Sequence, residues 1–569
     1  MKRISWLVVC VLTPLLVLAQ ASKLAPELQQ VSGMQRVAVI VQYKNVSPVA
    51  QRGVIGLRNG EVFSQLGVIN GVTATVPANS LAALAADPRV AYVSPDRVVR
   101  GHMNNAAPAV MANYAWSMGL DGTHIGVALI DSGVHAVDDV SFPSGGSRLL
   151  ASFDYTGEGS DDFYGHGTHV AGIIGGNGTD STCPVCNVTV RGIAPNVSLI
   201  SFKVLDSQGQ GSESAVIQAI QTAIQLKSKY NIRVMNLSLG RTVVESYKQD
   251  PLCQAVEQAW KAGIVVVVSA GNGGRDNAAG TVGYASVESP GNDPYVITVG
   301  AANTMGTASR SDDVMTSYSA KGPTAIDHIV KPDIVAPGNR VVSLAAPAWL
   351  ESTYPQNLIP YNYYQNTSSL DASPNYFVLS GTSMAAGIVS GAVALMLELD
   401  ATLTPDQVKA RLMKTAYKGL ARYVTITDGS SVFDVQSDVF TVGAGYLDIQ
   451  AALTNKDRAL GAAKSPTAVY DTGSGQAYFV ADMQTPWGLS LYYGKMAVAP
   501  SPAVWGAAAV WGPAEFVPGT PASGNSAMWG SSAMWGNSAM WGNSAMWGNS
   551  AMWGNSAMWG NGVEITGED

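Results

Sequence analysis

The middle of the chain alternates short apolar runs with longer amphipathic runs. Apolar runs of about four to eight residues are typical of buried parallel strands, and longer runs with helical periodicity are typical of the helices that cover them. The pattern therefore predicts an α/β fold, a mostly parallel central sheet flanked by helices. The predicted strands cover residues 125–130, 197–204, 234–237, 264–268 and 296–299, and the predicted helices cover 214–227, 252–262, 383–399 and 405–415.

Residues 22–102 form a separate unit of modest size. Strand-like runs at 36–43, 68–76 and 91–93 surround a small alanine-rich helix at 79–86. This order predicts a separate, compact α+β domain ahead of the larger α/β domain.

The first 21 residues have the layout of a signal peptide. A basic start, Met1-Lys2-Arg3, precedes an apolar run over residues 4–18 and then Ala19-Gln20-Ala21. The run is shorter than the ~20 residues that a membrane-spanning helix needs, so it is interpreted as a cleaved signal peptide at 1–21. The protein is therefore expected to be secreted.

The C-terminal part consists of near-identical hexapeptides. Tryptophans recur every six positions from Trp529 to Trp559, and no charged residue interrupts residues 526–560. In an extended chain this even period places every tryptophan on one side, which favours a sticky surface that contacts a cell surface or a glycan. Low-complexity disorder with no specific role is the alternative. We assign residues 456–500 to a connector or small appendage and 501–569 to the repeat tail.

Composition narrows the class of protein. The chain has 569 residues, 47% of them hydrophobic and 13% charged, which suits a globular protein with a large core. A formal net charge of −8 argues against a nucleic-acid partner. Cys10 is lost with the signal peptide. Of the remaining cysteines, Cys183 can form a disulfide with Cys186, or either of them can form one with Cys253.

Three segments carry candidate chemistry. Asp131 follows an apolar strand, His166 opens a small-residue helix, and Ser383 opens a long apolar helix. Each has an ordinary explanation by itself: a turn aspartate, a surface histidine and an N-cap serine. In this order, however, Asp, His and Ser form one of the known convergent triads. A zinc site at His166 and His169 is disfavoured, because the spacing and the glutamate of a zincin helix are missing.

The segments around these residues resemble the three signatures of the subtilisin-like serine proteases, the subtilases. They are Val127-Ala128-Leu129-Ile130-Asp131-Ser132-Gly133, His166-Gly167-Thr168-His169-Val170-Ala171-Gly172 and Gly381-Thr382-Ser383-Met384-Ala385. The resemblance implies a catalytic domain at 103–455 with Asp131, His166 and Ser383 as its triad. It also implies that Asn272, in Ser269-Ala270-Gly271-Asn272, lines the oxyanion hole. Residues 22–102 then resemble the inhibitor-like propeptide of the family, and a permanent N-terminal domain is the alternative.

The resemblance also implies where a peptide substrate binds. Two edge-like segments would sandwich an extended peptide by strand addition. They contain Gly209, Gln210 and Gly211 on one side and Ser238, Leu239 and Gly240 on the other. No acidic cluster stands in these segments, which argues against a strict requirement for basic residues. Arg241 follows where many relatives have a second glycine, a departure at the pocket rim.

The expected function is that of a secreted serine endopeptidase, acting through an acyl-enzyme and made as an autoprocessed zymogen. No cofactor is expected for catalysis. The family resemblance allows a structural Ca²⁺, whose ligands the sequence does not identify. The expected partners are protein or peptide substrates and the protein's own propeptide. The alternative is a catalytically idle surface-binding or adhesion protein that uses its tryptophan-rich tail.

Overall fold

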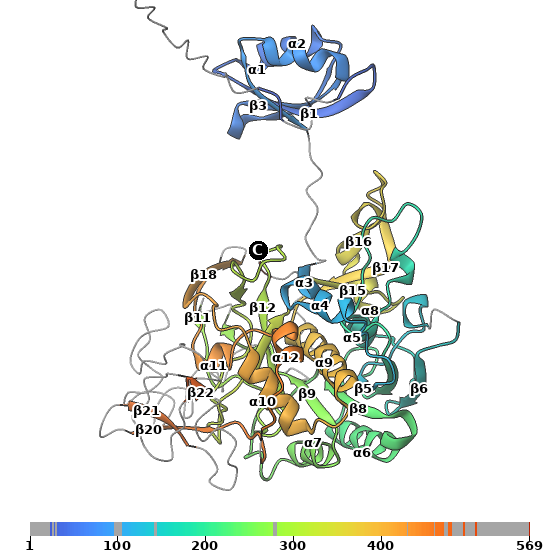
Figure 1. The fold of residues 1–569 in the computed structure, drawn as a ribbon, viewed down its shortest axis with the longest axis vertical. Coiled ribbons are helices and arrows are strands. Elements are labelled where there is room, and N and C mark those ends of the chain that lie inside the picture. Colours follow the sequence, from blue (N-terminus) through green and yellow to red (C-terminus); the bar gives the residue numbers. More distant parts are fainter. Residues whose placement is uncertain are drawn as a thin grey trace, which may run out of the picture. The chain divides into compact units, whose positions relative to one another are not determined.

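The chain divides into two compact units, Met1–Arg100 and Gly101–Asp569, which are described one at a time (Figure 1). The computed structural model describes residues 23–25, 28, 31–95, 105–141, 145–276, 281–428, 431–459, 461–471, 476–480, 493–494, 507–508 and 568. The predicted signal peptide and the hexapeptide repeats lie outside the described residues.

The first unit is an antiparallel sheet with two helices. The strands are ordered β2-β3-β1-β4, and the apolar side chains Val39, Val41 and Val76 are fully buried against the helices. The alanine-rich helix and three of the strands were predicted, although the middle strand starts three residues later than predicted, after a 3-10 turn at Gly67–Ile69. The elements are β1 (Arg36–Tyr43), α1 (Pro48–Gly56), β2 (Glu61–Leu66), β3 (Gly71–Pro77), α2 (Leu81–Ala86) and β4 (Val90–Pro95).

The second unit is built on an eight-stranded, mostly parallel sheet. Its strands are ordered β13-β12-β9-β8-β5-β7-β6, and β14 also pairs with β12. Only β13 runs antiparallel to its neighbour. All five predicted strands are present, within a few residues at each end. The strands are β5 (Gly126–Asp131), β6 (Leu149–Asp154), β7 (Ser198–Lys203), β8 (Ile232–Leu237), β9 (Val265–Ser269), β12 (Ile297–Asn303), β13 (Val314–Met315) and β14 (Ile334–Pro337).

Two helix pairs cover this sheet (Figure 1). One pair is α6 (Glu213–Tyr230) with α7 (Pro251–Lys261), and the other is α5 (His166–Gly175) with α9 (Thr382–Leu399). The predicted helix at 405–415 is α10 (Pro405–Thr415), which begins with the expected capping box at Thr404 and Gln407. α9 is long and apolar enough to cross a membrane, but 89% of it is buried inside the fold, so it is a core helix.

The remaining elements of the second unit lie around this core. A three-stranded antiparallel sheet has the order β15-β17-β16 and contains the apolar run that precedes Ser383. A hairpin, β18-β19, lies beside β11. These elements are α3 (Ala106–Ala109), α4 (Ala112–Ser117), β10 (Arg275–Asp276), β11 (Thr281–Val282), β15 (Val341–Leu344), α8 (Trp349–Thr353), β16 (Leu358–Pro360), β17 (Ala372–Leu379), β18 (Tyr423–Asp428), β19 (Ser431–Gln436), α11 (Val439–Val442) and α12 (Ile449–Thr454).

Residues beyond 455 contact the preceding part of the second unit. The Ser465 hydroxyl donates to Asp333 at 2.5 Å, and the backbone N–H of Ala468 donates to the carbonyl of His328 at 2.7 Å. An antiparallel hairpin follows, β20 (Thr467–Asp471) with β21 (Gln476–Val480). At the C-terminal end, the Glu568 side chain is only 1% exposed and its carboxylate lies 2.8 Å from Arg275.

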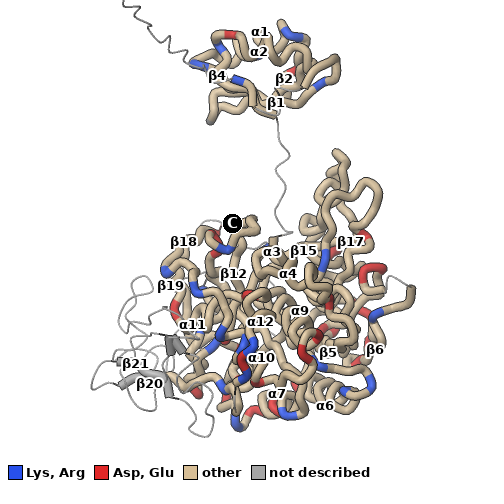
Figure 2. The backbone as a smooth tube through the Cα atoms, in the orientation of Figure 1, with Lys and Arg blue, Asp and Glu red and all other residues tan. Residues whose placement is uncertain are grey.

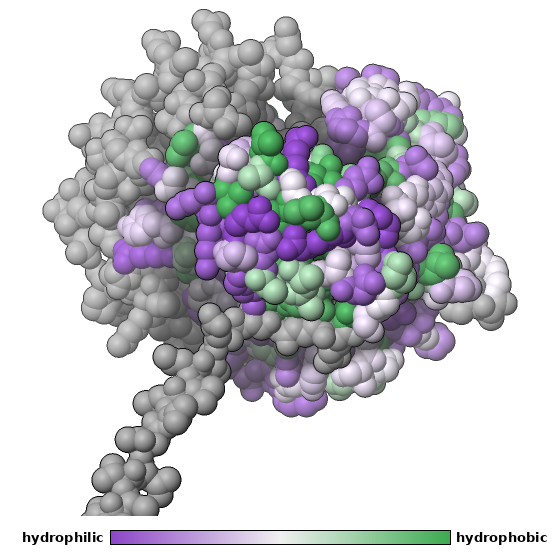
Figure 3. Space-filling view, turned by 90° about the horizontal axis from the view of Figure 1, so that it is seen from above, coloured by the Kyte–Doolittle hydropathy of each residue, from purple (hydrophilic) through white to green (hydrophobic). Residues whose placement is uncertain are grey.

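Charged residues are sparse and of mixed sign over both units (Figure 2). In the view of Figure 3, hydrophobic and hydrophilic side chains alternate in small groups over the coloured surface. Many of the hydrophobic residues lie instead in the core around the central sheet. Its strands β5, β9 and β12 are buried at every position.

Candidate active site

Asp131 and His166 meet where β5 ends and α5 begins. His166 Nδ1 lies 2.7 Å from Asp131 Oδ1, and the two side chains are 2% and 0% exposed. An imidazole held in this way donates its Nδ1–H to the carboxylate, which leaves Nε2 as the acceptor. Nε2 of His166 has no hydrogen-bond partner among the described residues.

Small residues allow α5 to approach β5 this closely. A Cβ on Gly167 would lie 2.1 Å from the carbonyl oxygen of Gly133, which itself has φ = 112°. The Gly167 N–H donates to the Ser132 hydroxyl at 2.9 Å, which fixes the first turn of the helix to the residue after Asp131.

Asp162, which the sequence analysis missed, organises both sides of this junction. Its Oδ1 accepts from the Ser132 hydroxyl at 2.8 Å and from the Gly165 N–H at 2.8 Å. Its Oδ2 accepts from the N–H and hydroxyl of Thr168 at 2.8 and 2.7 Å. A buried carboxylate at a helix N-terminus satisfies N–H groups that have no partner inside the helix.

The surroundings of His166 favour its charged form. Burial alone lowers the pKa of its imidazole, but the charge and hydrogen bond of Asp131, with a smaller effect of Asp162, outweigh burial and raise it above its ordinary value. An imidazolium formed at His166 is therefore stabilised.

Ser383 is the second residue of α9, after Gly381 at φ = 149°. Its hydroxyl donates to the Ser238 carbonyl at 3.2 Å, and the Ser238 hydroxyl donates back to the Ser383 carbonyl at 3.1 Å. The structure thus places Ser383 beside the predicted substrate segment, whereas its hydroxyl makes no hydrogen bond to His166.

Asn272 is fixed to the start of the same helix. Its Oδ1 accepts from the N–H and hydroxyl of Thr382 at 2.9 and 3.0 Å. With Oδ1 turned toward Thr382, the Nδ2 group is the free donor, and it donates to none of the described residues. Asn272 is thereby tied to the residue before Ser383, in the first turn of α9, where backbone N–H groups have no partner inside the helix.

The other predicted substrate segment lies near His166. A tight loop after β7 is closed by two hydrogen bonds between Asp206 and Gln210, at 2.7 Å through the backbone and 2.9 Å through the Asp206 carboxylate. Gly209, at φ = 72°, packs on the Tyr164 ring, and that ring's centroid is 6.5 Å from that of His166. Gly211 pairs with Leu205 across the loop.

Arg241, which follows Gly240, is turned toward two helices. Its guanidinium lies 3.2 Å from Glu213 in α6 and 3.0 Å from Asp250, the N-cap of α7. Arg241 therefore ties the end of the predicted substrate segment to α6 and α7.

A second acid that the sequence analysis missed is Glu288. A Cβ on Gly240 would lie 2.4 Å from Glu288 Oε2, and a Cβ on Gly271 would lie 2.7 Å from Glu288 Cδ. Glu288 is far from both glycines in the sequence and belongs to no motif, so only the fold shows that it adjoins Gly240 and Gly271.

His169 has a structural place. Its Nε2 lies 3.1 Å from the carbonyls of Val341 in β15 and Phe377 in β17. Burial lowers the pKa of His169 to about 3, so it stays neutral and fastens α5 to this antiparallel sheet.

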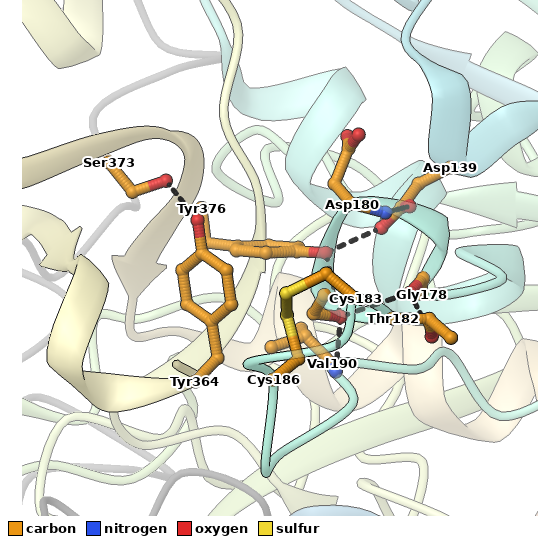
Figure 4. Close-up of a disulfide and its surroundings, with 11 residues drawn as sticks. Asp139, Gly178, Asp180, Thr182, Cys183, Cys186, Val190, Tyr364, Ser373 and Tyr376 are labelled. Atoms are coloured by element: carbon orange, nitrogen blue, oxygen red, sulfur yellow. Dashed lines mark hydrogen bonds between the residues drawn. A yellow bond between two sulfur atoms is a disulfide. The ribbon is translucent and has the colours of Figure 1, made fainter. Parts of the chain in front are cut away.

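Of the cysteine pairings left open by the sequence, the structure has the one between the two nearest cysteines. Cys183 and Cys186 form a disulfide, and Cys253 is free and buried (Figure 4). In the same region the Tyr376 hydroxyl donates to Asp139 at 2.9 Å, and the Asp180 N–H donates to the same carboxylate at 2.7 Å. The disulfide therefore closes a loop whose base is tied to β17.

No group of three or more His, Cys, Asp or Glu among the described residues is arranged to hold a metal ion. Asp139, the most buried acid of the disulfide region, already accepts from a hydroxyl and an N–H. No step of the chemistry is routed through a metal.

Comparison with known proteins agrees with this geometry. The model of the subtilase family (peptidase S8) matches residues 122–446. The chain is 34% identical to the serine protease AprX of Bacillus subtilis over 365 residues, 62% of this chain and 76% of AprX. It is 32% identical to subtilisin E of Bacillus subtilis over 397 residues, 69% of this chain and 86% of that protein. It is 33% identical to an extracellular serine proteinase of Thermus sp. over 410 residues, 69% and 80% of the two chains.

The fold and the site define an α/β serine hydrolase. The chain belongs to the subtilase family, and it is a serine-type endopeptidase. The predicted family, the α/β fold of the larger unit and the enzyme class are confirmed.

Proposed function

We propose that this protein cleaves peptide bonds with Asp131, His166 and Ser383 as its triad and Asn272 in its oxyanion hole. The observation that best supports the triad is the buried 2.7 Å contact between His166 and Asp131, with Nε2 of His166 left without a partner. Ser383 stands at the N-terminus of α9, where the helix dipole stabilises negative charge.

In the proposed reaction, His166 Nε2 takes the Ser383 proton as the Ser383 oxygen attacks the scissile carbonyl. The negative oxygen of the tetrahedral intermediate accepts from Asn272 Nδ2 and the Ser383 N–H. His166 returns the proton to the leaving amine, and an acyl-enzyme remains on Ser383. Water activated by His166 then releases the acid. Asp131 holds the imidazole in the required tautomer and stabilises its charge.

The substrate is proposed to lie extended between the segment at Gly209, Gln210 and Gly211 and that at Ser238, Leu239 and Gly240. Backbone hydrogen bonds to both edges would give affinity independent of sequence. The reciprocal hydrogen bonds between Ser238 and Ser383 support this placement, since they fix one edge beside the nucleophile.

The first unit is proposed to be a propeptide that the protease removes itself. It folds around its own core, and it exposes large apolar side chains, such as Val49 at 83% and Phe63 at 63%, suited to contact with another surface. The basic and apolar N-terminus and the extracellular relative support secretion.

The substitution Ser383→Ala tests both proposals. Triad members act as a unit, so loss of the nucleophile is expected to cost on the order of 10⁶ in rate. The variant should accumulate as a folded precursor that starts near residue 22, whereas the unmodified protein should start near residue 103. Terminal mass mapping, in a host without extracellular proteases, measures this.

Ser390→Ala is the matched control, because it removes a hydroxyl from the same helix that binds Asn236 at 2.8 Å. This variant should mature and cleave peptides. A Ser383→Ala protein that still matures alone would exclude Ser383 as the processing nucleophile.

An adhesion protein without catalysis is the other candidate, and the tryptophan repeats support it. A serine-reactive fluorophosphonate probe separates the two, because an idle protein would remain unlabelled while the proposed enzyme is labelled at Ser383.

A further inference from the structure

Glu288 places a carboxylate between the two segments that flank the proposed nucleophile. One neighbour is Gly240, at the end of the proposed substrate edge, and the other is Gly271, next to Asn272. Its Oε2 lies where a side chain on either glycine would begin, 2.4 and 3.0 Å from the respective Cβ positions. The carboxylate thus occupies space that exists only because both positions are glycine.

Backbone hydrogen bonds hold Glu288 at this point. Its N–H donates to the Ala270 carbonyl at 3.0 Å, beside Gly271. The next residue, Ser289, exchanges two backbone hydrogen bonds with Arg241, at 2.9 and 2.8 Å. The Glu288–Ser289 segment therefore contacts both the Gly240 and the Gly271 segment.

The carboxylate of Glu288 accepts no hydrogen bond and forms no ion pair with the described residues. Arg241, which follows Gly240, is engaged by Glu213 and Asp250. Burial, with no opposing charge, raises the pKa of Glu288 to about 7. An acid in such surroundings gains most from a cation that enters from outside the protein.

In the proposed binding mode, a side chain of the substrate points toward this carboxylate. The carbonyl attacked by Ser383 would turn its oxygen to Asn272, and the residue that owns that carbonyl would lie along the Ser238–Gly240 edge. Its side chain would then extend toward Gly240 and Gly271, where the Glu288 carboxylate lies. Lysine and arginine have the length and charge to reach an acid at this position.

We propose that Glu288 is the specificity-determining acid of the substrate pocket, and that it selects a lysine or arginine directly before the scissile bond. This inference rests on the proposed function and adds the substrate class. It reverses the expectation drawn from the sequence, which found no acid in the two substrate segments, because the acid is supplied by a third segment.

The test compares kcat/KM for otherwise identical peptides with Lys, Arg, Leu, Phe or Glu before the scissile bond. The unmodified protein should favour Lys and Arg. In Glu288→Gln, which keeps the shape and removes the charge, kcat/KM for Lys and Arg should fall roughly 10- to 100-fold, the range of a charged hydrogen bond. The value for Leu should stay the same or rise, which also shows that the variant is folded.

Glu245→Gln is the matched control, since it removes a neighbouring charge that lies 3.6 Å from Arg241 and not beside the two glycines. Its preference should equal that of the unmodified protein. Preference for Leu or Phe in the unmodified protein, or an unchanged Lys preference in Glu288→Gln, would overturn the inference and leave the protease function standing. Failure to cleave any peptide would instead count against the proposed function.

Discussion

Asp131 and Glu288 show how surroundings give two carboxylates different tasks. Asp131 is fully buried but bonded to His166 and to the Ser132 N–H at 2.8 Å, so its position is fixed. Among the described residues Glu288 has no such partner. One acid positions a base, and the other is available to recognise a cation.

The raised pKa of His166 predicts a pH profile. Because neutral His166 must accept the Ser383 proton, kcat/KM should fall as pH drops through a midpoint above the ordinary histidine value of about 6.5. The groups that face His166 are Asp131, Asp162 and neutral His169. A substrate with leucine before the scissile bond keeps the titration of Glu288 out of the measurement.

Asp131→Asn should shift this midpoint downward and lower kcat by about 10⁴-fold, because it removes the charge that favours the imidazolium. An unshifted midpoint would show that Asp131 does not set the pKa of His166. The pH dependence of stability has the opposite sign to that of activity. The His166–Asp131 pair stabilises the fold below about pH 6.5, and that contribution disappears as pH rises through the raised pKa of His166 in the folded protein.

At the scale of elements, the junction of β5 and α5 depends on a residue that no motif contains. Asp162 accepts hydrogen bonds from Ser132, Gly165 and Thr168 and is 2% exposed. Burial raises its pKa, and the hydrogen bonds only partly oppose burial. The start of the helix that carries His166 is therefore held by a carboxylate from the preceding loop.

Asp162→Ala should lower the free energy of unfolding by about 2–4 kcal/mol, because it leaves several buried donors unpaired. Asp161→Ala is the neighbouring control, since the Asp161 side chain is 46% exposed and its contacts, with His135 at 3.0 Å and the Asp162 N–H at 2.9 Å, are less buried than those of Asp162. The control should cost less than about 1 kcal/mol. Denaturant unfolding measures both, and equal losses would contradict the role given to Asp162.

How far the sequence predicts the elements depends on their burial. β9, Val265–Ser269, is apolar and buried at every position, and such runs were predicted within a few residues. β18, Tyr423–Asp428, is largely exposed and carries little apolar signal, so it was missed. The pairing of β17 with β15 and β16 depends on contacts between distant segments, which the local pattern does not encode.

The site divides in the same way. Asp131, His166 and Ser383 stand in motifs whose neighbouring residues predict the local structure. Asp162 joins Ser132 to the start of α5, and Glu288 adjoins Gly240 and Gly271, contacts that their own neighbours in the sequence do not indicate.

For the whole molecule, the C-terminal end of the chain belongs to the second unit. The Glu568 carboxylate accepts from the Ser317 N–H at 3.1 Å and pairs with Arg275 at 2.8 Å. Its backbone exchanges hydrogen bonds with the Asn339 side chain at 2.7 and 2.8 Å. A residue beyond the tryptophan repeats is thus bound in a polar pocket of the catalytic unit.

Glu568→Ala should lower the free energy of unfolding by about 1–3 kcal/mol, because Arg275 and Ser317 lose a buried acceptor. Glu564→Ala removes the same charge a few positions earlier and serves as the control. Calorimetry of the two full-length variants measures the difference. Identical unfolding of both would show that Glu568 does not contribute to the stability of the catalytic unit.

The pairing of the cysteines has a practical consequence. With Cys183 and Cys186 joined, the described residues keep one thiol, Cys253, which is buried and whose pKa burial raises well above its ordinary value. Thiol reagents react with accessible thiolates, so the folded, processed enzyme should resist maleimides. A single cysteine introduced on the surface would then accept one dye or one solid support at a defined position, without prior removal of native thiols.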